Sequence, residues 1–217
     1  MNTQNKKYEK AIAKTREYWD QRAQKHQNNQ DRIECSRRSQ NVLFEIFLRQ
    51  HDINHQSILD VGCGTGDLLE YLQNRKIDCQ YTGCDVSPAM IATCLERFPQ
   101  NQFITGNLLN WNPDRTFDYT VSFGIHNIHV PNGMVVLTKT LQYQYDICTK
   151  AAHMSLLTDR YTGFSQHIQP WRAEDILSLA LDITPYVTLR HDYLPHDFSI
   201  TLYRQPLIDT QQGLVLT

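Results

Sequence analysis

Residues 57–72 read "SILDVGCGTGDLLEYL", and this stretch decides the fold. A short apolar run, typical of a buried strand, ends in three glycines at alternate positions: Gly62, Gly64 and Gly66. An amphipathic helical pattern begins directly after them. Glycine lets a backbone come close to a ligand, because it has no side chain and tolerates positive φ angles. The stretch therefore predicts a ligand-binding turn between a strand and a helix.

Two common nucleotide-binding turns do not match this stretch. A dinucleotide turn, G-x-G-x-x-G, would have its third glycine where Asp67 stands, and an acid there would repel a pyrophosphate. A Walker loop needs G-K followed by Ser or Thr, which is absent. The spacing is instead D-x-G-x-G-x-G, from Asp60 to Gly66.

Strand-like and helix-like patterns alternate on both sides of the turn. Amphipathic helices are expected within 1–35 and at 37–50. The strands, with the one before the glycine turn, are expected at 57–61, 80–85, 102–106, 117–123, 151–158, 186–193 and 198–204. The further helices are expected at 66–76, 87–98, 133–150 and 171–182. This order predicts an α/β fold: a doubly wound, mostly parallel seven-stranded sheet that ends in an antiparallel hairpin.

The length and composition of the chain suggest one core domain with a helical extension. The 217 residues suffice for one full hydrophobic core. In the polar first 35 residues, apolar side chains recur at helical spacing, among them Tyr8, Ile12 and Trp19. We expect a helical lid over residues 1–50, a core domain over 51–205 and a tail over 206–217.

Charge and cysteine content exclude several classes of protein. A net charge of −2 does not favour a nucleic-acid binder, although residues 1–26 carry seven Lys or Arg against three Asp or Glu. No secretory signal and no run of about 18 apolar residues occurs. The six cysteines form no C-x-x-C pair, so we expect no disulfide framework and no metal site. A cytoplasmic protein with reduced thiols is the simplest prediction.

The glycine turn and the segments after it resemble the class I S-adenosylmethionine-dependent methyltransferase family. "LDVGCGTGDLL" is close to the first motif of that family, and the likeness continues through "YTGCDVSPAMI", "FITGNLLNW" and "FDYTVSFGI" to the terminal hairpin. It covers roughly residues 55–205 in pattern. The resemblance implies a seven-stranded fold and S-adenosylmethionine as the cofactor.

The chemistry of the turn suits this cofactor. Its methionine end carries a carboxylate, which a helix N-terminus attracts, and an ammonium, to which Asp60 can offer an acceptor. Asp85, at the end of the second strand, is expected to accept hydrogen bonds from both ribose hydroxyls, with Val86 and Met90 beside the adenine. The complete expected set of cofactor contacts is Tyr18, Arg37, Asp60, Gly62, Cys63, Gly64, Gly66, Asp85, Val86, Met90, Asn107, Leu108 and Phe123.

One of these positions departs from the family pattern. Asn107 follows the third strand, where the family often has an Asp that accepts from the adenine amino group. The carbonyl oxygen of Asn107 can still accept this bond, and its amide can donate to a ring nitrogen. The backbone N–H of Leu108 is expected to serve the adenine ring as well.

The methyl acceptor is expected beyond the fourth strand. His126 and His129 follow that strand in "GIHNIHVPN", and imidazole can remove a proton near neutral pH. We therefore predict them as catalytic residues, with His126 first. His167, His191 and His196 are weaker candidates because their loops are hard to place from sequence.

Several acceptors are disfavoured by missing motifs. "SFGI" stands where methyltransferases of DNA bases and glutamine carry [DN]-P-P-[YFW], and the double-Glu loop of protein arginine methyltransferases is absent. The leading prediction is therefore methyl transfer to a small-molecule O, N or S nucleophile. An RNA or protein methyltransferase and a catalytically inactive cofactor-binding partner subunit remain alternatives. The sequence leaves the oligomeric state open.

Overall fold

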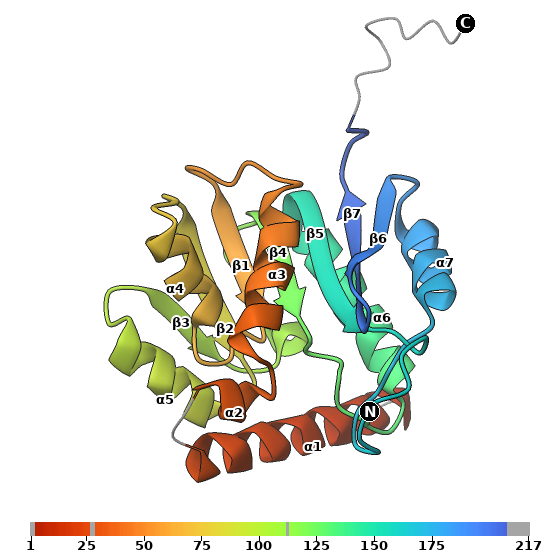
Figure 1. The fold of residues 1–217 in the computed structure, drawn as a ribbon, viewed down its shortest axis with the longest axis horizontal. Helices are drawn as coiled ribbons and strands as arrows, with labels where there is room; N and C mark the ends of the chain where they lie inside the picture. Colours follow the sequence, from red (N-terminus) through yellow and green to blue (C-terminus); the bar gives the residue numbers. More distant parts are fainter. Residues whose placement is uncertain (1–2, 27–28, 112, 208–217) are drawn as a thin grey trace, which may run out of the picture.

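A computed structural model of the protein describes residues 3–26, 29–111 and 113–207 (Figure 1). Its centre is a seven-stranded sheet in the order β3-β2-β1-β4-β5-β7-β6. The strands are β1 (Ser57–Val61), β2 (Gln80–Asp85), β3 (Gln102–Thr105), β4 (Phe117–Phe123), β5 (Cys148–Leu157), β6 (Val187–Leu194) and β7 (Asp197–Tyr203). Pairing from β3 to β5 is parallel, whereas β7 is antiparallel to both β5 and β6. The predicted fold class is confirmed.

Helices cover both faces of this sheet. They are α1 (Thr3–Lys25), α2 (Asn29–Ile33), α3 (Arg37–Leu48), α4 (Asp67–Asn74), α5 (Pro88–Arg97), α6 (Gly133–Ile147) and α7 (Ala173–Ile183), with a short 3-10 turn η1 (Leu108–Asn110). Side chains of α3 and α4 form one core cluster with β1, β2 and β4, and those of α6 and α7 form another with β5 and β7. The sheet is thus the middle layer of three.

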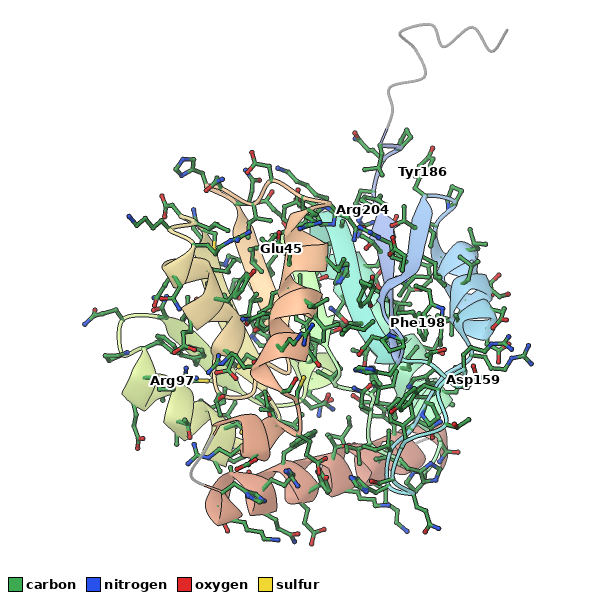
Figure 2. The ribbon with its side chains drawn as sticks, in the orientation of Figure 1. Glu45, Arg97, Asp159, Tyr186, Phe198 and Arg204 are labelled. Carbon is green, nitrogen blue, oxygen red and sulfur yellow. The ribbon has the colours of Figure 1, made fainter. Side chains whose placement is uncertain are left out.

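Strand β7 shows how sequence alternation assigns the two faces. Phe198, Ile200 and Leu202 are fully buried against α6 and α7, and Figure 2 shows Phe198 between the sheet and α7. The intervening residues Ser199 and Thr201 are polar and also buried, on the opposite face. Both faces of this strand are covered, because β7 is an inner strand of the sheet, between β5 and β6, and the sheet is the middle layer of three.

The predicted elements were found, with a few corrections. Ser87 caps α5 by accepting from the backbone N–H of Met90 at 3.1 Å, with Pro88 in the first turn. The helix predicted over 133–150 ends at Ile147, and β5 begins at Cys148 rather than at Ala151. The short helix α2 was not predicted. Most of the predicted tail, residues 208–217, lies outside the described residues.

Helices α1 and α2 determine where the site is. In Figure 1, α1 crosses the edge of the sheet at which the parallel strands end, below α5 and α6. Contacts with α5, α2 and α6 hold it there, and Asp20 accepts a hydrogen bond from the Ser87 hydroxyl at 2.5 Å. None of the helices in the described part of the chain combines the length and apolar character needed to cross a membrane.

Candidate functional site

A cavity of about 620 Å³ lies between α1 and the carboxyl ends of the parallel strands. This is where ligands of open α/β sheets bind, and the size is within the range of small-molecule sites. The walls come from the residues after β1, β2, β3, β4 and β5, from the start of β7, and from α1, α2 and α3. The expected contacts that line it are Asp60, Gly62, Cys63, Gly64, Asp85, Val86, Met90, Asn107, Leu108 and Phe123.

The glycine turn is built as the sequence suggests, and its glycines do different things. Gly62, Gly64 and Gly66 have φ angles of +71°, +54° and +81°, a region that favours glycine. A Cβ at Gly62 would lie 2.2 Å from Ile125 Cγ2, and one at Gly66 would lie 2.9 Å from the Phe98 ring. A Cβ at Gly64 would meet only Ile33 of α2, at 3.3 Å. The outer two glycines therefore serve packing, and Gly64 keeps the space below α2 open.

Asp85 ties this turn to the end of β2. One carboxylate oxygen accepts from the Gly64 N–H at 3.0 Å, and the other accepts from the Ser87 N–H at 2.8 Å. The residue is 8% exposed, and burial raises the pKa of its carboxyl from 3.8 to about 6, although the two N–H groups act in the opposite direction. Each oxygen keeps lone-pair capacity for a ligand hydroxyl. Among the described residues, Asp85 is thus a buried acceptor without a cationic hydrogen-bond partner.

Asp60 is a second buried acid at the end of the neighbouring strand. Its Oδ2 accepts from the Tyr81 hydroxyl at 2.7 Å. The pKa of Asp60 is raised to about 7, mainly by burial; the Tyr81 hydrogen bond lowers it, and the nearby charges of Asp85 and Asp67 contribute to the rise. A positively charged ligand group in the cavity would remove much of this penalty, because an opposite charge favours the ionised form.

Arginines hold the first turn of α4 from outside the cavity. Asp67 is buried and pairs with Arg97 of α5 at 2.7 Å, and Arg37 pairs with Glu70 at 2.8 Å. Arg97 is labelled in Figure 2, near the end of α5. Arg37 does not line the cavity, so its guanidinium supports α4 instead of facing a ligand carboxylate as expected. Gln40 of α3, missed in the sequence, donates to Asp67 and lines the cavity.

Two buried polar atoms beside the turn have no hydrogen-bond partner among the described residues. They are the hydroxyl oxygen of Thr65 and Oε1 of Gln40, and both residues line the cavity. Buried polar groups normally find partners, and an unpaired one points to a missing ligand or water. Together with Asp60 and Asp85, they provide acceptors and a hydroxyl donor for an amino acid end of a ligand.

The adenine end of the predicted site is closed by α1. The Tyr8 hydroxyl donates to Asn107 Oδ1 at 2.7 Å, and Tyr8 is 6% exposed. Trp19 also lines the cavity, whereas Tyr18 does not. Tyr18 donates to Glu34 at 2.5 Å, so Tyr8 and Trp19, and not Tyr18, are the aromatic side chains of α1 that line the cavity. Helical spacing alone does not tell which face of α1 turns inward.

The two predicted catalytic histidines lie in different surroundings. His126 lines the cavity and is 8% exposed, and its Nε2 has no partner among the described residues. Burial lowers its pKa to about 3, so the expectation that it titrates near neutrality is wrong. His129 is exposed, bonds to Gln169 at 2.8 Å and does not line the cavity. The three-residue spacing turns its ring away from the site.

The weaker histidine candidates also separate in space. His167 and His196 line the cavity, and His191 is exposed outside it. Asp197, which follows His196 and begins β7, lines the cavity and was missed. Because β7 runs antiparallel to β5, its first residue lies at the edge where the parallel strands end, and the predicted hairpin could have revealed this. In the described ranges, no cluster of three or more His, Cys, Asp or Glu residues is arranged to hold a metal ion.

The residues present fit S-adenosylmethionine. Buried acceptors lie at the ends of β1 and β2, an amide follows β3, and apolar side chains flank the space between them. The three acids Asp60, Asp67 and Asp85 suit a cofactor that carries a sulfonium and an ammonium. They would oppose a pyrophosphate, in agreement with the spacing of the turn.

Comparisons with known proteins agree with this arrangement. Residues 58–143 match a family model described as "Methyltransferase domain". The trans-aconitate 2-methyltransferase of Escherichia coli O1:K1 / APEC is 36% identical over 74 residues, which are 34% of this chain and 29% of that enzyme. A Mycobacterium tuberculosis (strain ATCC 25618 / H37Rv) protein provisionally named methyltransferase Rv1506c is 29% identical over 156 residues, 66% of this chain and 90% of that protein. The chain thus matches less than a third of the length of the trans-aconitate enzyme.

The fold is also found among solved structures. Magnesium protoporphyrin IX methyltransferase from Synechocystis PCC 6803, crystallised with bound SAH, has a TM-score of 0.67 to this chain. The match covers 90% of this chain and 100% of that one, at 14% sequence identity. At this identity the likeness shows a shared fold.

Proposed function

We propose that this chain, which belongs to the class I S-adenosylmethionine-dependent methyltransferases, transfers the methyl group of that cofactor to a small-molecule acceptor. The observation that carries the proposal is the cavity wall formed by residues 62–65 of the glycine turn, Asp85 and Asn107, from three adjacent strand ends; Gly66 does not line the cavity. Bound there, the cofactor supplies a methyl group that a sulfonium has already activated.

Each half of the cavity has its own task in this proposal. The β3-β2-β1 half holds the cofactor, with Asp85 accepting from the ribose hydroxyls and Asp60 receiving the ammonium. The β4-β5-β7 half, with His126 and Asp197, holds the acceptor. Placing the acceptor in line with the methyl group supplies much of the catalysis, because the reaction is a direct displacement.

The position of α1 favours a small acceptor over RNA or protein. Helix α1 lines the side of the cavity away from the sheet with Tyr8, Ile12, Thr15 and Trp19. A macromolecular substrate would have to displace this helix. We propose that the N-terminal segment, residues 1–50, works as a lid over the core domain, 51–205. A cofactor-binding partner subunit without activity would not need the acceptor half, which is why this alternative is less favoured.

Transfer of a labelled methyl group tests the proposal. The purified protein is incubated with methyl-labelled S-adenosylmethionine and, in parallel, with metabolite, RNA and protein fractions. We expect label in the metabolite fraction and formation of S-adenosylhomocysteine. Label in RNA or protein alone would overturn the small-molecule proposal, and cofactor binding without transfer to any fraction would support the partner-subunit alternative.

A further inference from the structure

The acceptor half of the cavity has a wall of its own, separate from the cofactor contacts. It comes from the end of β5, the loop before α7 and the start of β7. Its members include Leu157, Tyr161, Phe164, Trp171, His196 and Asp197, and the loop adds Gly163, Ser165, His167 and Ile168. The Tyr161 and Phe164 rings lie 4.9 Å apart in an edge-on arrangement, and Tyr161 lies 5.7 Å from the His196 ring. Most of this wall is therefore apolar and aromatic, with a single carboxylate in it.

The Asp, Glu, Lys and Arg side chains that line the cavity are all acidic. Its lining includes acids but neither a Lys nor an Arg among the described residues. The acids are Glu34, Asp60, Asp67, Asp85 and Asp197. A carboxylate acceptor would enter this cavity without a guanidinium or an ammonium to meet it, and burying an unpaired anion is strongly unfavourable.

Four of these acids already have strong partners. Glu34 pairs with Arg22 at 2.8 Å and Asp67 with Arg97 at 2.7 Å. Asp60 accepts from the Tyr81 hydroxyl, and Asp85 accepts from two backbone N–H groups. These acids are therefore committed to the frame of the site or to the cofactor.

Asp197 is different from the other four. It is 4% exposed, and its carboxylate has one polar side-chain neighbour among the described residues, His196 Nε2 at 3.3 Å. Burial raises the pKa of Asp197 to about 7 and lowers the pKa of His196, so neutral pH does not favour an ion pair between them. Cys35 and Tyr193, the other titratable groups that sense its charge, carry no positive charge.

A second observation points to a ligand in the same half. Nε2 of His126 is buried without a partner among the described residues, and His126 lines the cavity after β4. Its imidazole is neutral at physiological pH because of burial. A neutral imidazole and a carboxylate can both accept hydrogen bonds from one group that carries several N–H or O–H donors. A methyl acceptor that is an anion would lack such donors.

We infer that the methyl acceptor is an amine on an apolar body, with its nitrogen held by Asp197 and its body against the aromatic wall formed by Tyr161, Phe164 and Trp171. This inference rests on the proposed methyltransferase function. An ammonium is the charge that would pair with this buried carboxylate, and aromatic faces in the same wall of the cavity also attract a cation. Asp197 is then a specificity-determining residue that contacts the substrate.

The transfer step balances with the groups present. The bound ammonium gives one proton to Asp197, which leaves the nitrogen with a free lone pair. That pair forms the new N–C bond as the S–C bond breaks, and the bonding electrons remain on sulfur. The product is a protonated, methylated amine and the neutral thioether of the cofactor. A carboxyl whose pKa lies near the working pH suits this proton transfer.

The test compares acceptors of similar shape and opposite charge. Phenethylamine, phenethyl alcohol and hydrocinnamate are offered with labelled S-adenosylmethionine, and their binding is measured by calorimetry with S-adenosylhomocysteine present. We expect the amine to bind and to be methylated in preference to the other two. Preference for the carboxylate or the alcohol, or no binding of the amine, would overturn the inference.

The variant Asp197→Asn tests the residue itself. It keeps the shape of the side chain and removes the charge, so KM and Kd for the amine should rise about ten- to a hundredfold. Asp192→Asn is the matched control on the same hairpin, because Asp192 is exposed and pairs with Arg190. Its amine affinity should equal that of the unmodified protein. Equal amine affinity in Asp197→Asn would contradict the assignment.

Cofactor affinity separates this inference from the proposed function. S-Adenosylmethionine should bind Asp197→Asn as it binds the unmodified protein, because Asp197 lies in the acceptor half. If the unmodified protein does not bind the cofactor, the proposed function itself fails. If it binds the cofactor and methylates carboxylates, the function stands and only the inference about amines is wrong. If Asp197→Asn does not fold, the preference of the unmodified protein among the three compounds still decides.

Discussion

Replacing Asp85 with Asn should weaken cofactor binding and at the same time remove a loss of stability that the ligand-free protein undergoes as the pH rises. The structure gives both reasons. Burial raises the Asp85 pKa from 3.8 to about 6, even though the carboxylate accepts from the N–H groups of Gly64 and Ser87. Ionised Asp85 is thus a net burden to the empty fold, and a neutral side chain of the same shape removes it.

The size of the stability effect follows from the pKa. One pKa unit corresponds to about 1.36 kcal/mol, so the difference between 3.8 and about 6 corresponds to roughly 3 kcal/mol. At pH 3, Asp85 is mostly protonated in both the folded and the unfolded state, and its neutral form adds no penalty. Between pH 3.8 and about 6 the unfolded chain releases this proton before the folded protein does, so stability is lost over that range and stays lost above it. An Asn offers only one acceptor oxygen to the two N–H groups, which costs about 1–3 kcal/mol at every pH. The stability of Asp85→Asn relative to the unmodified protein should therefore rise by about 3 kcal/mol between pH 3 and pH 7.5.

The effect on binding has the opposite sign. The carboxylate is expected to accept two hydrogen bonds from the ribose, and an Asn oxygen can replace only part of them. The loss should be about 1.5–3 kcal/mol, or ten- to a hundredfold in Kd.

Urea unfolding of the ligand-free protein at several pH values, with calorimetry of S-adenosylmethionine binding at pH 7.5, measures both effects. Asp78→Asn is the control, because the Asp78 side chain is 80% exposed just before the same strand. It should change stability by less than about 0.5 kcal/mol and leave binding intact. The reasoning would be refuted if the stability of Asp85→Asn relative to the unmodified protein did not rise between pH 3 and pH 7.5, or if its cofactor affinity changed less than about twofold.

Three more outcomes follow from the same geometry. Gly64→Val should abolish cofactor binding, because its side chain would fill the space that Gly64 keeps open, and the protein should still fold, because a Cβ there would meet only Ile33, at 3.3 Å. Circular dichroism checks the fold and calorimetry checks binding; unchanged affinity in the folded variant would contradict the prediction. His126→Ala should leave cofactor affinity near normal and reduce kcat by about 10²-fold if the ring contacts the methyl acceptor, and a normal kcat would exclude this contact. Because burial lowers the pKa of His126, kcat of the unmodified protein plotted against pH should show no change near pH 6.5 from this residue. Amide protons of α1 should exchange more slowly when S-adenosylmethionine binds, if α1 is a lid, and mass spectrometry that finds equal exchange would show that it is a fixed part of the fold.

The sequence by itself determined the layers of the fold and the cofactor half of the cavity. Strands β2 and β4 have the predicted bounds, and Ser87 caps α5 as expected. The turn after β1 and the residue at the end of β2 were identified without a structure, because these features are local. A glycine spacing, a cap and a strand end are each written in a few consecutive residues, and parallel strands always bring their carboxyl ends to one edge.

The acceptor half depended on contacts between distant parts of the chain. His126 and His129 look alike in sequence, yet one is buried in the cavity and the other is exposed. Asp197 is an ordinary turn residue until β7 pairs with β5 and brings it to the edge of the sheet at which Asn107, 90 positions earlier, also lies. Burial, and with it the pKa of a side chain, comes from neighbours that the folded chain brings together, so only the tertiary structure could decide which of these groups faces the cavity and in which charge state.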